Sequence, residues 1–189
     1  MDELERHPSL DERFDPAIRI VEHDPGWAAQ AQQELHRLSE ALGPDAKRLE
    51  HVGSTAVPGL AAKPILDLQM SVTAIEPRGR YVPHLERLGY LFVPDPESPD
   101  FHLFAKPAER PRSHHLHVCE AGSDHEFRHL ALRDYLRGHD DEAARYAALK
   151  REAAKGAQQD RLTYIEAKEG YVRDLEARAV TWARAARVS

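Results

Sequence analysis

A helix is the first element that the hydrophobic pattern predicts. After the turn Asp24-Pro25-Gly26, apolar residues recur at steps of three or four, as on one face of an amphipathic helix. These residues are Trp27, Ala31, Leu35, Leu38 and Leu42. Gly43-Pro44 follows the last of them and is expected to end the helix.

Shorter apolar runs predict β-strands up to about residue 120. We expect strands at 18–23, 49–52, 65–72, 90–93, 101–105 and 115–118. The last two flank a basic, proline-rich link and are typical of a hairpin. A short helix over residues 81–88 is expected to end at Gly89.

The pattern changes after Gly122, where long helical stretches follow one another. They cover 126–137, 141–155 and 161–187. The layout therefore predicts an α+β protein with an acidic N-terminal tail, an α+β core and a C-terminal helical lobe packed on that core. The expected bounds are 1–17, 18–122 and 123–189.

Composition and charge narrow the class of protein. Of the 189 residues, 41% are hydrophobic and 31% are charged, which is typical of a globular protein. There is no apolar run of 18 residues and no basic-then-apolar leader, and Cys119 cannot form an internal disulfide, so we expect a cytoplasmic protein without a membrane span. The net charge is −6, and residues 1–15 hold six acidic residues against two basic ones. The nearly neutral remainder does not indicate binding to duplex nucleic acid, but it permits a local cationic pocket for a nucleotide.

Gly53-Ser54 is a candidate phosphate-binding turn because it directly follows a predicted strand. Glycine lets the backbone approach a phosphate closely, and the hydroxyls of Ser54 and Thr55 add donors. The segment is not a P-loop, since Lys63 lies ten residues after Gly53. A plain strand-to-loop turn with Ser54 as a helix N-cap remains the alternative.

Asp67 is the candidate metal ligand, because it interrupts the apolar strand ILDLQM. A carboxylate there is costly unless it lies at an open end of the sheet or holds a cation. One carboxylate can anchor Mg²⁺ with help from substrate phosphates. Gln69 shares its face of the strand but supplies no charge. The alternative is that Asp67 caps or braces a loop.

Two histidines form a second cluster in the segment HHLHV. His115 and His117 project from one face of a strand and, if that strand neighbours Asp67, three ligands would converge. Such a set suits zinc as well as magnesium chemistry. The alternative is that these histidines lie on a solvated face.

Basic residues that could line a phosphate pocket are Lys63, Lys106, Arg110, Arg112, Arg133, Lys150 and Lys168.

The segment EHVGSTAVPGLAAKPILDLQ resembles the GrpB family of the nucleotidyltransferase superfamily. The likeness continues through HHLHV, HLALRDYLRGHDDEAARYAALK and YIEAK, and covers roughly residues 18–180. The resemblance implies a polymerase-beta-like nucleotidyltransferase fold, with a mixed sheet, packed helices and a following helical region. The family positions matched here are Gly53, Ser54, Lys63, Asp67, His115, His117, Arg133, Lys150 and Lys168.

Three functions follow from these observations. The leading one is a nucleotidyltransferase that moves a nucleoside monophosphate from a triphosphate to an unknown acceptor, with Asp67 and His117 catalytic and Mg²⁺, or else Mn²⁺ or Zn²⁺, as the metal. The superfamily's second acidic ligand is Gln69 here, so His117 or Glu50 would complete the metal site. That substitution also supports a second interpretation, a nucleotide-binding module without turnover. A histidine-dependent metal or nucleotide hydrolase is the third.

Overall fold

A five-stranded mixed sheet forms the centre of the computed structural model, which describes residues 13–94 and 99–186. The strand order is β1-β2-β5-β4-β3. Strands β2 and β5 run parallel, and the other neighbouring pairs are antiparallel. The strands are β1 Arg48–Val52, β2 Leu66–Val72, β3 Leu91–Val93, β4 Phe101–Lys106 and β5 His114–Glu120.

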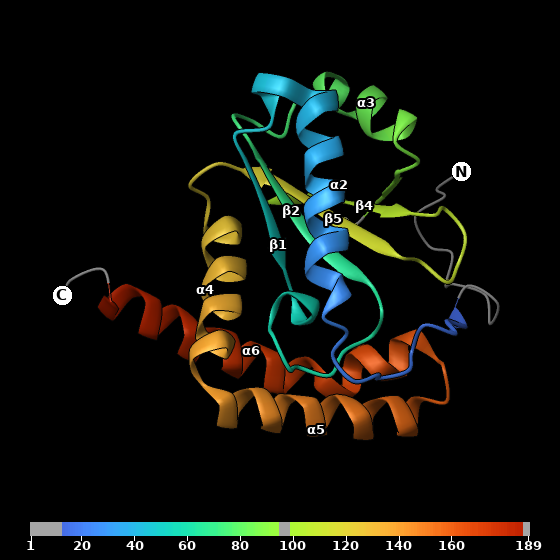
Figure 1. Ribbon diagram of the computed structural model, residues 1–189, viewed down its shortest axis with the longest axis vertical. Helices are drawn as coiled ribbons and strands as arrows, with labels where there is room; N and C mark the ends of the chain where they lie inside the picture. Colours follow the sequence, from blue (N-terminus) through green and yellow to red (C-terminus); the bar gives the residue numbers. More distant parts are fainter. Residues whose placement is uncertain (1–12, 95–98, 187–189) are drawn as a thin grey trace.

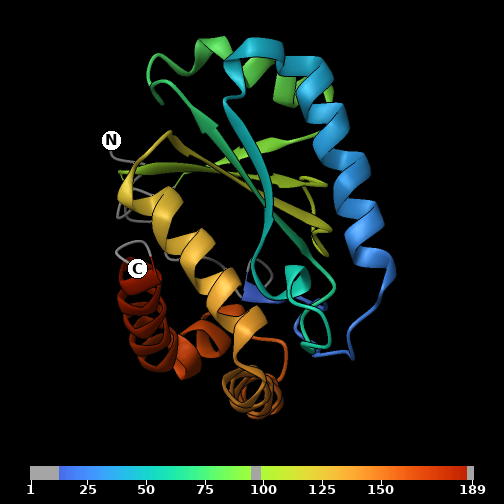
Figure 2. The same ribbon diagram turned by 60° about the vertical axis from the view of Figure 1, so that its left-hand side comes forward.

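Helices cover both faces of the sheet and lie below one end of its strands (Figure 1). Helix α2 lies on one face, α4 lies on the other, and α5 and α6 run below the sheet in that view. Turning the molecule shows α4 leaning over the strands, with α6 beside its lower end (Figure 2). The helices are α2 Gly26–Leu42, α3 Val82–Arg87, α4 Asp124–Gly138, α5 Asp140–Ala157 and α6 Arg161–Ala186, with 3₁₀ turns η2 Gly43–Asp45, η3 Ser54–Ala56 and η4 Arg78–Arg80.

The predicted fold class is confirmed: this is an α+β protein with a mixed sheet and a C-terminal helical region. The strands β4 and β5 pair as the predicted hairpin. No helix in the described ranges 13–94 and 99–186 is both long and apolar enough to cross a membrane.

The two faces of β2 have different chemistry because side chains alternate along a strand. Leu66, Leu68 and Met70 pack into the main hydrophobic core with α2 and α3. Asp67 and Gln69 project to the opposite face, which α4 covers. Every other residue of the strand is thus polar and lies on the helical-lobe side, which explains how an apolar strand carries a carboxylate.

Two predictions at the N-terminal end need correction. The expected strand at 18–23 forms a single bridge, between Val21 and Ala62, because Ile18 instead packs against the helical residues Ala153 and Tyr164. Residues 1–12 of the expected tail lie outside the described ranges. Residues 13–17, the rest of it, pack against the body: Asp15 is 1% exposed.

Candidate anion-binding site

A cavity of about 710 Å³ opens where β2 and β5 begin, and α5 and α6 supply its opposite wall. Side chains from three strands meet at this end of the sheet. The parallel strands β2 and β5 both begin there, and the antiparallel strand β1 ends there. Positive charge dominates the lining. Its basic residues are Lys63, Arg110, Arg112, Lys150, Arg161 and Lys168, against the acidic Asp15 and Asp67.

Asp67 lies at the floor of the cavity, between a histidine and a glycine. His115 Nδ1 lies 3.2 Å from Asp67 Oδ1, across the parallel pairing of β2 and β5. Gly53 has φ +68°, and a Cβ built on it would lie 2.5 Å from Asp67 Oδ2. Glycine is therefore required at position 53 both for its backbone angle and for the close approach of the carboxylate.

The Asp67 carboxylate is held ionised. Burial disfavours its charge, but the hydrogen bond from His115 and the nearby ammonium of Lys63 outweigh burial and lower the pKa of Asp67 to about 2. The side chain remains partly exposed to the cavity. A fixed negative charge therefore faces an otherwise cationic pocket.

Lys150 reaches the turn that follows β1. Its Nζ donates a hydrogen bond of 2.8 Å to Ser54 Oγ and lies 4.4 Å from the centre of the Tyr146 ring. Lys150 is 3% exposed. Burial, and then the neighbouring Lys168, lower the pKa of Lys150 to about 7. An anion in the cavity would favour the charged form of this lysine.

Two further lysines flank one aromatic ring. Lys63 Nζ and Lys168 Nζ lie 5.3 Å and 5.5 Å from the centre of the Tyr164 ring. Burial lowers the pKa of both lysines, and Asp67 partly offsets this effect. The ring provides a cation–π contact to each ammonium, while the charge of Lys63 further lowers the pKa of Lys168.

Several lining residues were missed by the sequence-based prediction. Asp15 accepts a 2.6 Å hydrogen bond from Arg110 Nη1 and so anchors the guanidinium at the cavity wall. Arg161, Tyr146 and Tyr164 also line the cavity. These three residues lie on helices, and the sequence around a helix residue does not show whether its side chain faces solvent, the core or a cavity. Arg110 and Arg112 were among the basic residues considered, and both line the cavity.

Some predicted phosphate ligands have other partners. Arg133 donates to Glu50 Oε2 at 2.7 Å and to the His51 carbonyl at 3.1 Å. It lines a smaller neighbouring cavity of about 100 Å³, together with Gly53 and Asp67, and not the main one. Thr55 Oγ1 pairs with His51 Nε2 at 2.9 Å, although Thr55 lines the cavity. Lys106 is also absent from the lining, because it pairs with Glu34 of α2 on the far face.

The expected metal set of Asp67, His115 and His117 is not formed. His117 lines the cavity, but within the described chain its ring nitrogens group with those of two α4 residues instead. The physical reason is that α4 packs against this face of β5 and brings its own imidazoles there. Gln69, which pairs with His117 in the sheet register, is 1% exposed, and neither amide atom has a hydrogen-bond partner in the described ranges.

Known proteins share this architecture. The model of the GrpB protein family matches residues 17–178, nearly the whole chain. The chain belongs to the GrpB family. A crystal structure of the conserved protein GrpB from Enterococcus faecalis superposes with a TM-score of 0.80 at 31% identity, covering 87% of this chain and 99% of that one. The likeness therefore extends over the sheet and the helical region together.

Curated GrpB relatives carry different names. A UPF0157 protein of Halalkalibacterium halodurans is 36% identical, over 86% of this chain and 83% of that protein. A protein of Mycolicibacterium paratuberculosis named dephospho-CoA kinase is 34% identical, over 88% of this chain but only 47% of its own length. A GrpB-like region thus makes up about half of that longer protein.

Proposed function

We propose that this chain binds a nucleoside triphosphate in the cavity and transfers its nucleotidyl group to an acceptor hydroxyl. The observation that carries the proposal is the lining: six basic side chains surround one partly exposed carboxylate in a space of about 710 Å³. A triphosphate is the nucleotide part that such a charge excess matches best. The cavity volume lies within the range of small-molecule sites.

The donor set fits one magnesium ion held jointly with phosphates. Asp67 is a partly exposed, ionised carboxylate, and a single carboxylate with substrate oxygens is a common Mg²⁺ site. It does not fit a two-metal site, because Asp15, the other acidic residue in the described lining, is bound to Arg110. When bound, the ion would neutralise charge on the transferring phosphate.

The chain's own residues would perform the remaining steps. Lys63 and Lys168 bind phosphate oxygens, and the acceptor oxygen bonds to the α-phosphorus as the bond to the departing pyrophosphate breaks. His115 accepts the hydroxyl proton: when its Nδ1–H is donated to Asp67, its Nε2 carries the free lone pair. The arrangement supplies positioning and charge more than covalent chemistry.

Binding without turnover is the second candidate function. Gln69 stands on the strand face where a second carboxylate would be needed, and it is a neutral, buried amide. A site that holds the triphosphate through its lysines needs no second metal. In this second function the protein binds the same nucleoside triphosphate but does not transfer the nucleotidyl group.

Calorimetric titration tests the shared ligand. We expect ATP, GTP, CTP or UTP, each with Mg²⁺, to bind more tightly than the matching monophosphate. Lys168→Met removes one phosphate contact and should weaken binding by about 10- to 100-fold. The matched control is Lys155→Met, because Lys155 is exposed on α5 and outside the cavity. Affinity that is absent, or equal in both variants, contradicts the proposal.

A pyrophosphate-release assay then separates the two candidates. The native chain is incubated with the bound triphosphate and a panel of hydroxyl acceptors, with His115→Gln as the matched variant. Release that requires His115 supports nucleotidyl transfer. Tight binding with no release over the panel supports the binding module.

A further inference from the structure

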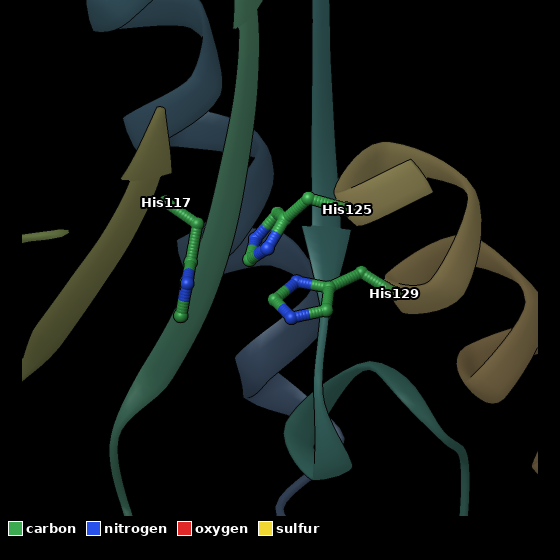
Figure 3. Close-up of side chains that lie close together, drawn as sticks. All are labelled: His117, His125 and His129. Atoms are coloured by element: carbon green, nitrogen blue, oxygen red, sulfur yellow. The ribbon is translucent and has the colours of Figure 1, made fainter. Parts of the chain in front are cut away.

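A group of three histidines lies behind the cavity, between β5 and α4 (Figure 3). His117 projects from the strand, while His125 and His129 stand one turn apart on the helix and share a face. Each offers a ring nitrogen, and these atoms lie within 4.8 Å of one another. In a tetrahedral zinc site, imidazole nitrogens lie about 2.0–2.1 Å from the ion and hence about 3.4 Å apart. The largest separation in the structure exceeds that spacing by about 1.4 Å at most.

The hydrogen-bond pattern around the cluster points to a missing ligand. His125 is 3% exposed, and neither of its ring nitrogens has a hydrogen-bond partner in the described ranges. The Nδ1 atoms of His117 and His129 are also buried without a partner there. Leaving a buried polar atom unpaired costs about 1–3 kcal/mol. An ion bound through one nitrogen of each ring would give these buried imidazoles a partner.

Aromatic contacts hold the rings in place. The ring centres of His117 and Phe101 lie 5.3 Å apart, in a stacked arrangement. Phe101 stacks on His125 with ring centres 4.2 Å apart, which fixes the orientation of that imidazole. Neutral imidazoles without a neighbouring thiolate suit Zn²⁺ and similar transition metals, and they do not suit Mg²⁺.

We propose that His117, His125 and His129 form a three-histidine site for a divalent transition metal ion, Zn²⁺ foremost. Three protein ligands leave a fourth position open, as in zinc sites that bind water or substrate. His117 also lines the anion cavity, so the ion would border the space in which phosphates are proposed to bind. The proposal does not rest on nucleotide binding, because His125 and His129 lie outside the cavity lining.

Cobalt substitution tests the site without any nucleotide. The native chain is treated with a chelator, titrated with Co²⁺ and then with Zn²⁺. We expect one equivalent of Co²⁺ to give the strong visible bands of tetrahedral coordination, and Zn²⁺ to displace it. His125→Gln and His129→Gln should each weaken binding by about 10- to 100-fold or more, because the loss of a ligand exceeds the loss of an outer-shell partner. The control is His36→Gln, on the exposed face of α2, which should bind as the native chain does.

Unfolding curves of the metal-free variants show whether each variant is folded. A crystallographic measurement on the native chain tests the site without any variant. Crystals soaked in Zn²⁺ should give an anomalous peak, at the zinc absorption edge, within bonding distance of the three rings. Weak octahedral Co²⁺ bands, bands that survive both substitutions, or an anomalous map without that peak would each overturn the proposal.

Discussion

Lys150 Nζ and Ser54 Oγ are joined by a 2.8 Å hydrogen bond between residues 96 positions apart in the chain. The bond links helix α5 to the turn after β1, at the side of the carboxylate of Asp67. The candidate site is thus built by the sheet and the helical region together. A helical residue completes what begins as a strand-to-turn motif.

Gly53→Ala should destabilise the chain by about 2–4 kcal/mol. The added Cβ combines the strain of φ +68° with a 2.5 Å approach to Asp67 Oδ2. Gly59→Ala is the matched control, since Gly59 has φ +77° but no heavy atom within 4 Å of the added Cβ. The extra loss in Gly53→Ala, measured by urea unfolding, reports the Asp67 contact together with the strain of ψ −169° at Gly53. Equal losses would show that backbone strain is the whole effect.

Asp67→Asn should lower the free energy of unfolding at pH 7 by about 1–2 kcal/mol. The pKa of Asp67 is lowered from 3.8 to about 2 in the folded chain, so its ionised form stabilises the fold above about pH 4. That contribution is lost as the pH falls from about 4 towards 2. The free energies of unfolding of the native chain and the variant should therefore approach each other between pH 4 and 2, in unfolding curves measured from pH 2 to 7. Exposed Asp174→Asn serves as control and should show no such convergence.

Lys150→Met should make the ligand-free chain more stable at pH 6, by about 1–3 kcal/mol. With a folded pKa of about 7 against 10.5, Lys150 holds fewer protons folded than unfolded between these values, so native stability rises with pH across that window. Below pH 7 the buried charge is a constant cost, which methionine removes. The advantage of the variant should shrink from pH 7 upward in urea unfolding. A variant that is less stable at pH 6 would contradict the assigned burial cost.

Arg133 should prove structural, with little effect on phosphate affinity. Its Nη1 donates to Glu50 Oε2 at 2.7 Å, and its side chain is largely buried. Arg133→Met leaves Glu50 without this partner and should cost about 1–3 kcal/mol of stability. A double-mutant cycle with Glu50→Gln should recover a coupling energy between the two. A strong loss of triphosphate affinity in Arg133→Met would instead restore the ligand role predicted from the sequence.

The local sequence was enough to predict most of the elements and to single out Asp67, which lines the cavity of the candidate site. Hydrophobic periodicity predicted α2, the hairpin of β4 and β5 and the long C-terminal helices, because such periods follow directly from which face is buried. The polar break in ILDLQM likewise marked Asp67. The apolar pattern wrongly predicted a strand at residues 18–23, where the apolar side chains pack on helices instead of joining the sheet.

Only the tertiary structure decided which distant charges meet. A basic residue on a helix looks alike in sequence whether it faces solvent, as Lys155 does, or enters a cavity, as Lys150 does. Lys150 and Arg133 were predicted to share one role, yet the packing of α4 and α5 gives one to the cavity and the other to Glu50. The histidine cluster depends in the same way on α4 crossing β5. Sequence fixes periodicity and residue chemistry locally, whereas convergence of side chains depends on long-range packing that no local pattern encodes.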